Sequence, residues 1–143
     1  MSVTSVFGAF RSTLQAYTPV LTNGTNGTPT AFWYRDGQWL EVNGLITWTG
    51  AGEAGALAIA LPTGLVMATS LLTGGTDAGA QLSTYIGSGQ WRDAGAQFEP
   101  IAVLFASSTT VNLAENTQLI FGNQMANTDS LKFIFRVPIA GWA

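Results

Sequence analysis

The sequence predicts an all-β fold, a jelly-roll-like β-sandwich of about eight or nine antiparallel strands with a short N-terminal arm. Short apolar or alternating segments recur along the chain, and clusters of Gly, Thr, Asn and Asp separate them. Only 9% of the residues are charged, against roughly 25% in typical soluble domains, while 47% are hydrophobic. We expect residues 1–16 to form the arm and residues 17–143 to form a single sandwich domain.

The arm differs in pattern from the rest of the chain. Phe7, Phe10 and Leu14 recur at helical spacing, which gives one weak apolar stripe. Such a short segment is not stable as an isolated helix, so its apolar side chains need another surface to cover them. We expect the arm to lie on a neighbouring subunit. The alternative is a turn packed on the chain's own domain.

The first two strands of the sandwich form a predicted hairpin. Asp36-Gly37 lies between the expected strands at 30–35 and 38–49, and this dipeptide is typical of tight turns because both positions tolerate positive φ. In the second strand most even positions from Leu40 to Trp48 are apolar, whereas the odd positions are mostly polar. This alternation predicts one buried and one exposed face.

The rest of the chain predicts further short strands. We expect them at residues 56–61, 65–72, 82–86, 99–105, 109–113, 117–121 and 131–137. The last of these alternates cleanly, with Leu131, Phe133, Phe135 and Val137 against Lys132, Ile134 and Arg136. The apolar run at 65–72 is bracketed by Gly and is short, which favours a fully covered strand over a helix. Gly87-Ser88-Gly89 is expected to be a turn-rich break, which would leave Trp91 in a loop.

The sequence offers few groups for catalysis. It contains no His and no Cys, so the commonest general base, the thiol nucleophile and the usual zinc ligands are missing. Glycoside hydrolysis needs only two carboxylates, but most Asp and Glu residues here lie in or beside Gly-rich turns. Glu41, on a strand face beside Trp39, is the best placed to lie on a sugar-binding surface. We expect no enzyme activity, no metal and no cofactor.

The charge pattern argues against two classes of partner. The formal net charge is −3, and the five basic residues are scattered along the chain. They cannot neutralise a run of phosphates or hold the chain on an anionic membrane. The longest apolar stretches are too short to cross a bilayer. We therefore expect neither nucleic-acid binding nor membrane binding.

The five tryptophans are the strongest functional signal. Strand parity places Trp39 and Trp48 on opposite faces, so the tryptophans cannot all share one core. Exposed Trp favours subunit interfaces and sugar platforms, although a thick sandwich could also bury most of them. An amide-rich segment at 123–127 is a second candidate patch, expected near Trp91. The possible interface or glycan-binding side chains are Trp33, Trp39, Trp91, Asn123, Gln124 and Asn127.

Four segments together resemble a recurring pattern in virion proteins of tailed bacteriophages. They are Tyr17-Thr18-Pro19, Phe32-Trp33-Tyr34-Arg35-Asp36-Gly37, Val42-Asn43-Gly44-Leu45-Ile46 and Ala60-Leu61-Pro62-Thr63-Gly64. The pattern is similar to that of β-sandwich knobs of tail fibres and of small capsid decoration, or cement, proteins. These proteins are typically homotrimers without enzymatic activity. The resemblance covers roughly residues 17–64.

The resemblance implies two alternative functions. The first is a capsid decoration protein that trimerises and stabilises the phage head by bridging subunits of the major capsid protein. We place it first because only 16 residues precede the predicted domain, whereas a fibre protein usually has a long shaft before its knob. The alternative is a tail-fibre knob that binds a host surface polysaccharide. Both locate the protein in the virion, the first on the capsid surface.

Overall fold

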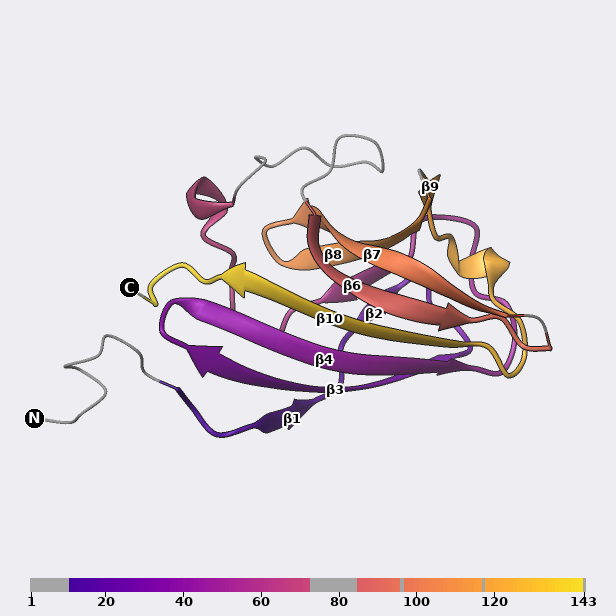
Figure 1. The fold of residues 1–143 in the computed structure, drawn as a ribbon, viewed down its shortest axis with the longest axis horizontal. Helices are drawn as coiled ribbons and strands as arrows, with labels where there is room; N and C mark the ends of the chain where they lie inside the picture. The colour runs from indigo at the N-terminus through magenta and orange to yellow at the C-terminus, as the bar shows by residue number, and fades with distance from the viewer. Residues whose placement is uncertain (1–10, 73–84, 96, 117, 143) are drawn as a thin grey trace, which may run out of the picture.

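The computed structural model describes residues 11–72, 85–95, 97–116 and 118–142. These residues form one antiparallel ten-stranded sheet that curls over on itself (Figure 1). Side chains from β4 and β10 on one side pack into the same core as side chains from β5 and β8 on the other. The predicted all-β, sandwich-like fold is therefore confirmed, with ten strands in place of about eight or nine.

The strands follow one another in the sheet in the order β1-β3-β4-β10-β6-β7-β8-β5-β2, with β9 paired to β8. Their bounds are β1 (Gln15–Tyr17), β2 (Leu21–Thr22), β3 (Gly27–Asp36), β4 (Trp39–Trp48), β5 (Ala58–Ala60), β6 (Tyr85–Arg92), β7 (Phe98–Ser107), β8 (Thr110–Glu115), β9 (Gln118–Leu119) and β10 (Ser130–Pro138). Two short 3₁₀ helices, η1 (Thr69–Leu71) and η2 (Gly122–Gln124), lie between strands.

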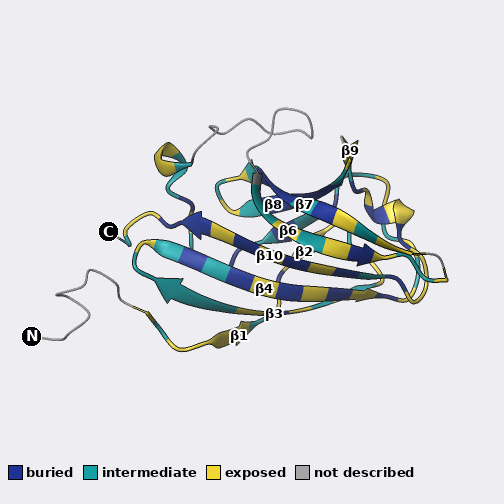
Figure 2. Cartoon of the chain, in the orientation of Figure 1, coloured by how far each residue is buried: buried dark blue, intermediate teal, exposed yellow. Residues whose placement is uncertain are grey.

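The predicted hairpin is present as β3 and β4. Asp36 pairs with Trp39, so the two turn residues are Gly37 and Gln38, one position later than the sequence predicts. Gly37 has φ of 64°, a left-handed conformation that favours glycine. Along β4 the even positions are buried and the odd positions are not, and Trp48 is only 2% exposed. The predicted alternation of β4 is therefore confirmed (Figure 2).

The strand β10 lies in the middle of the sheet, between β4 and β6. Its odd positions from Leu131 to Val137 are buried, and its even positions from Lys132 to Arg136 are exposed. Phe133 packs directly over Gly44 of β4, where an added Cβ would lie 2.2 Å from the ring. The sheet thus has an apolar inner face and an outer face open to solvent.

The prediction of a strand at 65–72 is wrong. Met67 makes only an isolated bridge with Ile139, and the chain then turns into η1. The backbone N–H of Met67 donates to Ser108, whereas that of Ala68 donates to Pro138. Because these partners belong to two different parts of the sheet, the segment crosses the end of the sandwich and cannot form a continuous ladder. Apolarity alone does not reveal this path.

The prediction of a break at Gly87-Ser88-Gly89 is also wrong, because all three residues lie inside β6. A Cβ at Gly87 would lie 2.1 Å from the carbonyl oxygen of Ile134, and one at Gly89 would lie 2.0 Å from that of Lys132. The two glycines therefore permit a close approach of β6 to β10 and do not mark a turn. The extended path of β6 carries Trp91 into the core, where it is 7% exposed.

Residues 11–17, which include the end of the predicted arm, run beside β3. The backbone N–H of Ser12 donates to the carbonyl oxygen of Arg35, and Gln15 pairs with Trp33 in the β1–β3 ladder. Leu14 is 61% exposed, so the described residues leave most of its side chain uncovered. Phe7 and Phe10 lie outside the described residues, so the proposed contact of the arm with a neighbouring subunit stays a prediction.

Candidate functional site

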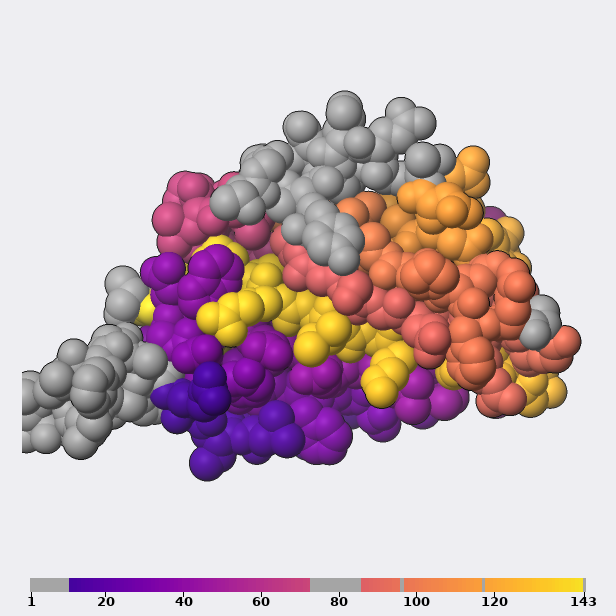
Figure 3. All heavy atoms as spheres, viewed as in Figure 1, coloured from indigo at the N-terminus to yellow at the C-terminus, as the bar shows by residue number. Residues whose placement is uncertain are grey.

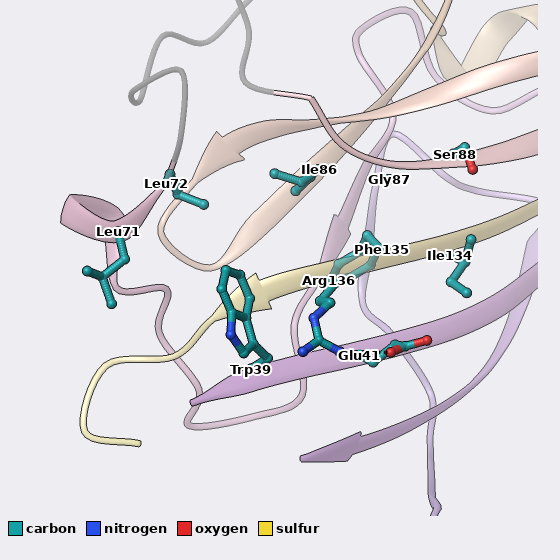
Figure 4. Close-up of a pocket in the computed structure, with 10 residues that line it drawn as sticks. All are labelled: Trp39, Glu41, Leu71, Leu72, Ile86, Gly87, Ser88, Ile134, Phe135 and Arg136. Carbon is teal, nitrogen blue, oxygen red and sulfur yellow. Dashed lines mark hydrogen bonds and ion pairs between the residues drawn. The ribbon is translucent and has the colours of Figure 1, made fainter. Parts of the chain in front are cut away.

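The outer face of the sheet has a groove beside the start of β4 and the end of β10 (Figure 4). Its volume is about 380 Å³. The groove is lined by side chains from β4, β10 and β6 and by the two leucines at the end of η1. We call it the Trp39 groove, after the largest side chain in its wall.

Sheet register brings the polar residues of the groove together. Glu41 of β4 pairs directly with Arg136 of β10, and Trp39 is the next outward residue along β4. The guanidinium carbon of Arg136 lies 5.2 Å from the centroid of the Trp39 ring, a cation–π arrangement. Its Nη1 also lies 3.3 Å from Oε2 of Glu41. An indole, a guanidinium and a carboxylate therefore meet in one wall.

The opposite side of the groove is apolar. Figure 4 shows Leu72 and Ile86 across from the Trp39 ring, with Ile134 farther along β10. Ile134 is 39% exposed and Leu71 is 49% exposed, which is high for such large apolar side chains. The groove thus combines a few polar groups with apolar and aromatic surface, which is the usual composition of a small-ligand site.

Hydrogen bonds hold the carboxylate of the groove in place. The hydroxyl of Tyr34 donates to Oε2 of Glu41 at 2.7 Å, and this bond, with burial and the negative charge of Glu41, raises the pKa of Tyr34. Arg136 bridges Glu41 to Asp36, which also accepts from Arg11 at 3.3 Å. Burial alone would raise the pKa of Asp36, but the hydrogen bonds from the two arginines lower it.

The structure does not bring Trp33 into the groove. Trp33 pairs with Val42, whose side chain is buried, so it lies on the opposite side of the sheet from the groove. It stacks on Trp142 with ring centroids 6.1 Å apart, and the guanidinium of Arg35 lies 4.8 Å from the Trp142 ring. Trp33 is therefore partly covered by the chain itself.

Among the predicted site residues, Trp91 differs most clearly from its expected placement. It lies in β6 and not in a loop, and its side chain belongs to the hydrophobic core. An indole that is 7% exposed offers no platform to a ligand or a subunit. The parity of β6 explains this position, because Trp91 pairs with Leu131 and shares its inward direction.

The amide-rich segment lies at the other end of the sheet from the groove, at η2 (Figure 1). Asn123, Gln124 and Asn127 are all exposed, but no described contact joins them to Trp91 or to Trp39. The backbone N–H of Phe121 donates to Oε1 of Gln124 at 2.6 Å. This side chain thus helps to close the turn at the start of η2, and the predicted patch is separate from the groove.

Sequence reasoning missed the partner of Trp39. Arg136 and Ile134 lie on the outward positions of a strand that the alternation predicts, so their exposure could be foreseen. Their position beside Trp39 depends on the pairing of β10 with β4, which are separated by about 90 residues, and no local pattern specifies that pairing. The alternation of β4 does indicate Glu41 as a site residue, because it places Glu41 on the same outward face as Trp39.

Two further observations concern the described part of the chain. Within it, no helix is long and apolar enough to cross a membrane. In the same residues, no group of three or more Asp and Glu side chains is arranged to hold a metal ion.

No protein-family model and no curated protein matches the sequence. Among solved structures, the fold is similar to part of the Dettilon tailspike protein, with a TM-score of 0.54 and 18% sequence identity. The similarity covers 89% of this chain but only 24% of the tailspike chain. At this identity the similarity shows a shared all-β fold, and this chain corresponds to a small part of the larger protein.

Proposed function

We propose that this chain is a receptor-binding module of a tailed-bacteriophage virion, and that the Trp39 groove binds a polysaccharide on the host surface. The groove carries the proposal, because Trp39, Glu41 and Arg136 meet there beside an apolar wall. Sugars present apolar C–H faces that stack on aromatic rings and hydroxyl groups that bind charged side chains. The groove offers a partner for each of these groups.

Two observations from outside the groove support a role in the virion. The fold is similar to part of the Dettilon tailspike protein. The resemblance in residues 17–64 is also to virion proteins. The small share of the tailspike that is matched fits a module of a larger assembly.

We propose binding without hydrolysis. A glycosidase needs one carboxyl that is protonated and can donate, usually because its pKa is raised. In this network the pKa of Asp36 is lowered by its two arginine partners, which favours the ionised form. Glu41 accepts hydrogen bonds from Tyr34 and Arg136. Both carboxylates are thus arranged as acceptors.

The test is binding of the purified chain to an array of bacterial surface polysaccharides, followed by titration calorimetry with each polysaccharide that binds. Trp39→Ala should weaken binding by about twofold to tenfold, since stacking on an aromatic ring contributes about 0.5–1.5 kcal/mol. Phe32→Ala is the matched control, because it removes an exposed aromatic side chain from outside the groove. Equal affinity of the two variants and the unaltered chain would refute the proposal.

Capsid decoration is the second candidate, favoured by a different observation. Phe32 is 47% exposed and Leu45 is 39% exposed on the same outer face, which leaves two large apolar side chains open to solvent. A face of this kind suits a contact with the major capsid protein or within a homotrimer. Counting copies in purified virions separates the two functions, because a decoration protein is present in hundreds of copies and a tail module in far fewer.

A further inference from the structure

The Trp39 groove is one end of a longer surface on the outer face of the sheet. Beyond Ile134, the outward residues of β10 are Lys132 and Ser130, and their partners on β6 are Gln90 and Arg92. Arg92 in turn pairs with Phe98 of β7. Ser130 lies six positions before Arg136 in β10, which is roughly 20 Å at the rise of a strand.

A second hollow lies at the far end of this surface. It has a volume of about 370 Å³ and is lined by Arg92, Asp93, Gly95, Gln97 and Phe98. Phe98 is 61% exposed and offers a second aromatic ring to solvent. An aromatic residue with an arginine therefore stands at each end, and small or polar side chains of β6 and β10 lie between them. The outward side chains of β10 are visible in yellow on the face shown in Figure 3.

The charges of this surface differ from those of the whole chain. The chain has eight acidic and five basic residues, yet three of the basic residues, Arg92, Lys132 and Arg136, lie on this face. The carboxylates of this surface are those of Glu41 and Asp36, which both pair with Arg136, and that of Asp93, which lines the second hollow. No described ion pair involves Lys132 or Arg92. This surface, which we call the track, therefore offers Lys132 and Arg92 as cations for the acidic groups of a ligand.

We propose that the ligand is an acidic polysaccharide, carrying carboxylate or phosphate groups, that lies along β6 and β10 from the Trp39 groove to Phe98. This proposal rests on the proposed function and specifies the ligand class. Trp39 and Phe98 stack on sugar rings at the two ends, while Lys132 and Arg92 bind the acidic groups between them. The length of the track fits a short oligosaccharide and not a single sugar.

The same charges do not suit a nucleic acid. Tight non-specific binding to DNA neutralises on the order of 6–10 phosphates, and this track offers two cations without an ion-pair partner among the described residues. Two cations between two aromatic rings fit a polymer of sugars that carry acidic groups.

The experiment measures binding of the whole chain to polygalacturonate, hyaluronan and wall teichoic acid, which supply carboxylate or phosphate groups. Carboxyl-reduced polygalacturonate is the neutral control. We expect at least one acidic polymer to bind, with an affinity that falls as NaCl rises from about 0.05 to 0.5 M. Lys132→Thr with Arg92→Thr should weaken binding by about tenfold or more, because charge-assisted hydrogen bonds are lost. The charge-preserving pair Lys132→Arg with Arg92→Lys should weaken binding less than the threonine pair does, because the two positive charges remain.

Three outcomes would overturn the inference, and they are distinguishable. If only neutral polymers bind, and binding depends on Trp39 but not on Lys132 or Arg92, the acidic ligand is wrong while the glycan-binding function stands. If acidic polymers bind equally well to the threonine double variant, the track is wrong. If no polymer of the panel or of the bacterial array binds, the function and the inference both fail. Thermal unfolding of each variant checks that the fold is unchanged.

Discussion

The inner and outer faces of β4 and β10 are built from alternate residues of the same strands, yet they have opposite characters. On the inner face, Val42 and Phe133 are at most 1% exposed and belong to one apolar core. On the outer face, Glu41 and Arg136 form an ion pair at the protein surface. In a strand, one residue of shift moves a side chain from one face to the other. Stability and recognition can therefore change independently along a single strand.

The largest effect that would test this comparison is in the core. Phe133→Ala removes a ring that is 1% exposed and should lower the free energy of unfolding by about 3–5 kcal/mol. Ile134→Ala, one residue along, removes a partly exposed side chain and should cost less than about 1 kcal/mol. Urea denaturation of both variants measures the difference. Similar losses in the two variants would show that the outer face is also part of the core.

A smaller effect is expected where the backbones of β6 and β10 approach closely. Gly89→Ala places a methyl group 2.0 Å from the carbonyl oxygen of Lys132, so one strand must shift. We expect a loss of about 1–3 kcal/mol, as for other overpacked sites. Ser88→Ala, on the exposed side of the same strand, is the control and should change stability by less than about 0.5 kcal/mol. Thermal unfolding that gives equal stability for both variants would refute the explanation for this glycine.

The smallest effect concerns Glu115, at the end of β8. A hydrogen bond with Glu99 raises the pKa of Glu115 to about 7, and burial and the charges of Glu99 and Asp93 add to the shift. The same hydrogen bond lowers the pKa of Glu99. Because the folded state holds the Glu115 proton more tightly than the unfolded state, this group stabilises the fold at low pH. That contribution is lost as pH rises from about 4.5 to about 7.

Glu115→Gln keeps a hydrogen-bond donor without the titration. The variant should therefore gain stability relative to the unaltered chain between pH 5 and pH 8, by less than about 1 kcal/mol because solvent screens the pair. Melting temperatures across this range measure the effect. Glu53→Gln is the control, since the pKa of Glu53 is lowered by Thr25 and that carboxylate stays ionised throughout. Parallel pH profiles for the Glu115 variant and the unaltered chain would contradict the assignment.

The sequence predicts the local part of this structure well. Alternation identifies β4 and β10 together with their buried faces, and Asp36-Gly37 locates the hairpin to within one residue. These features depend on side chains one or two positions apart. The sequence also identifies Trp39 and Glu41 as neighbours on an exposed face.

The errors arise where tertiary contacts override the local pattern. Gly87 and Gly89 have the composition of a turn, but they serve the close approach of β6 to β10. Residues 65–72 have the composition of a strand, but their backbone bonds go to two separate segments. Arg136 could not be assigned to the site because its pairing with Glu41 spans most of the chain. Local sequence patterns do not specify the register between strands that are far apart in the chain.

The most direct test of the central claim, that the outer face of β4, β10 and β6 is the ligand face, is an NMR titration with a polysaccharide that binds. The five tryptophan indole N–H resonances report separately on the two faces. The account predicts that the Trp39 signal shifts with ligand, while those of Trp48 and Trp91, which are at most 7% exposed, stay in place. A shift confined to Trp33 and Trp142, with Trp39 unmoved, would contradict it.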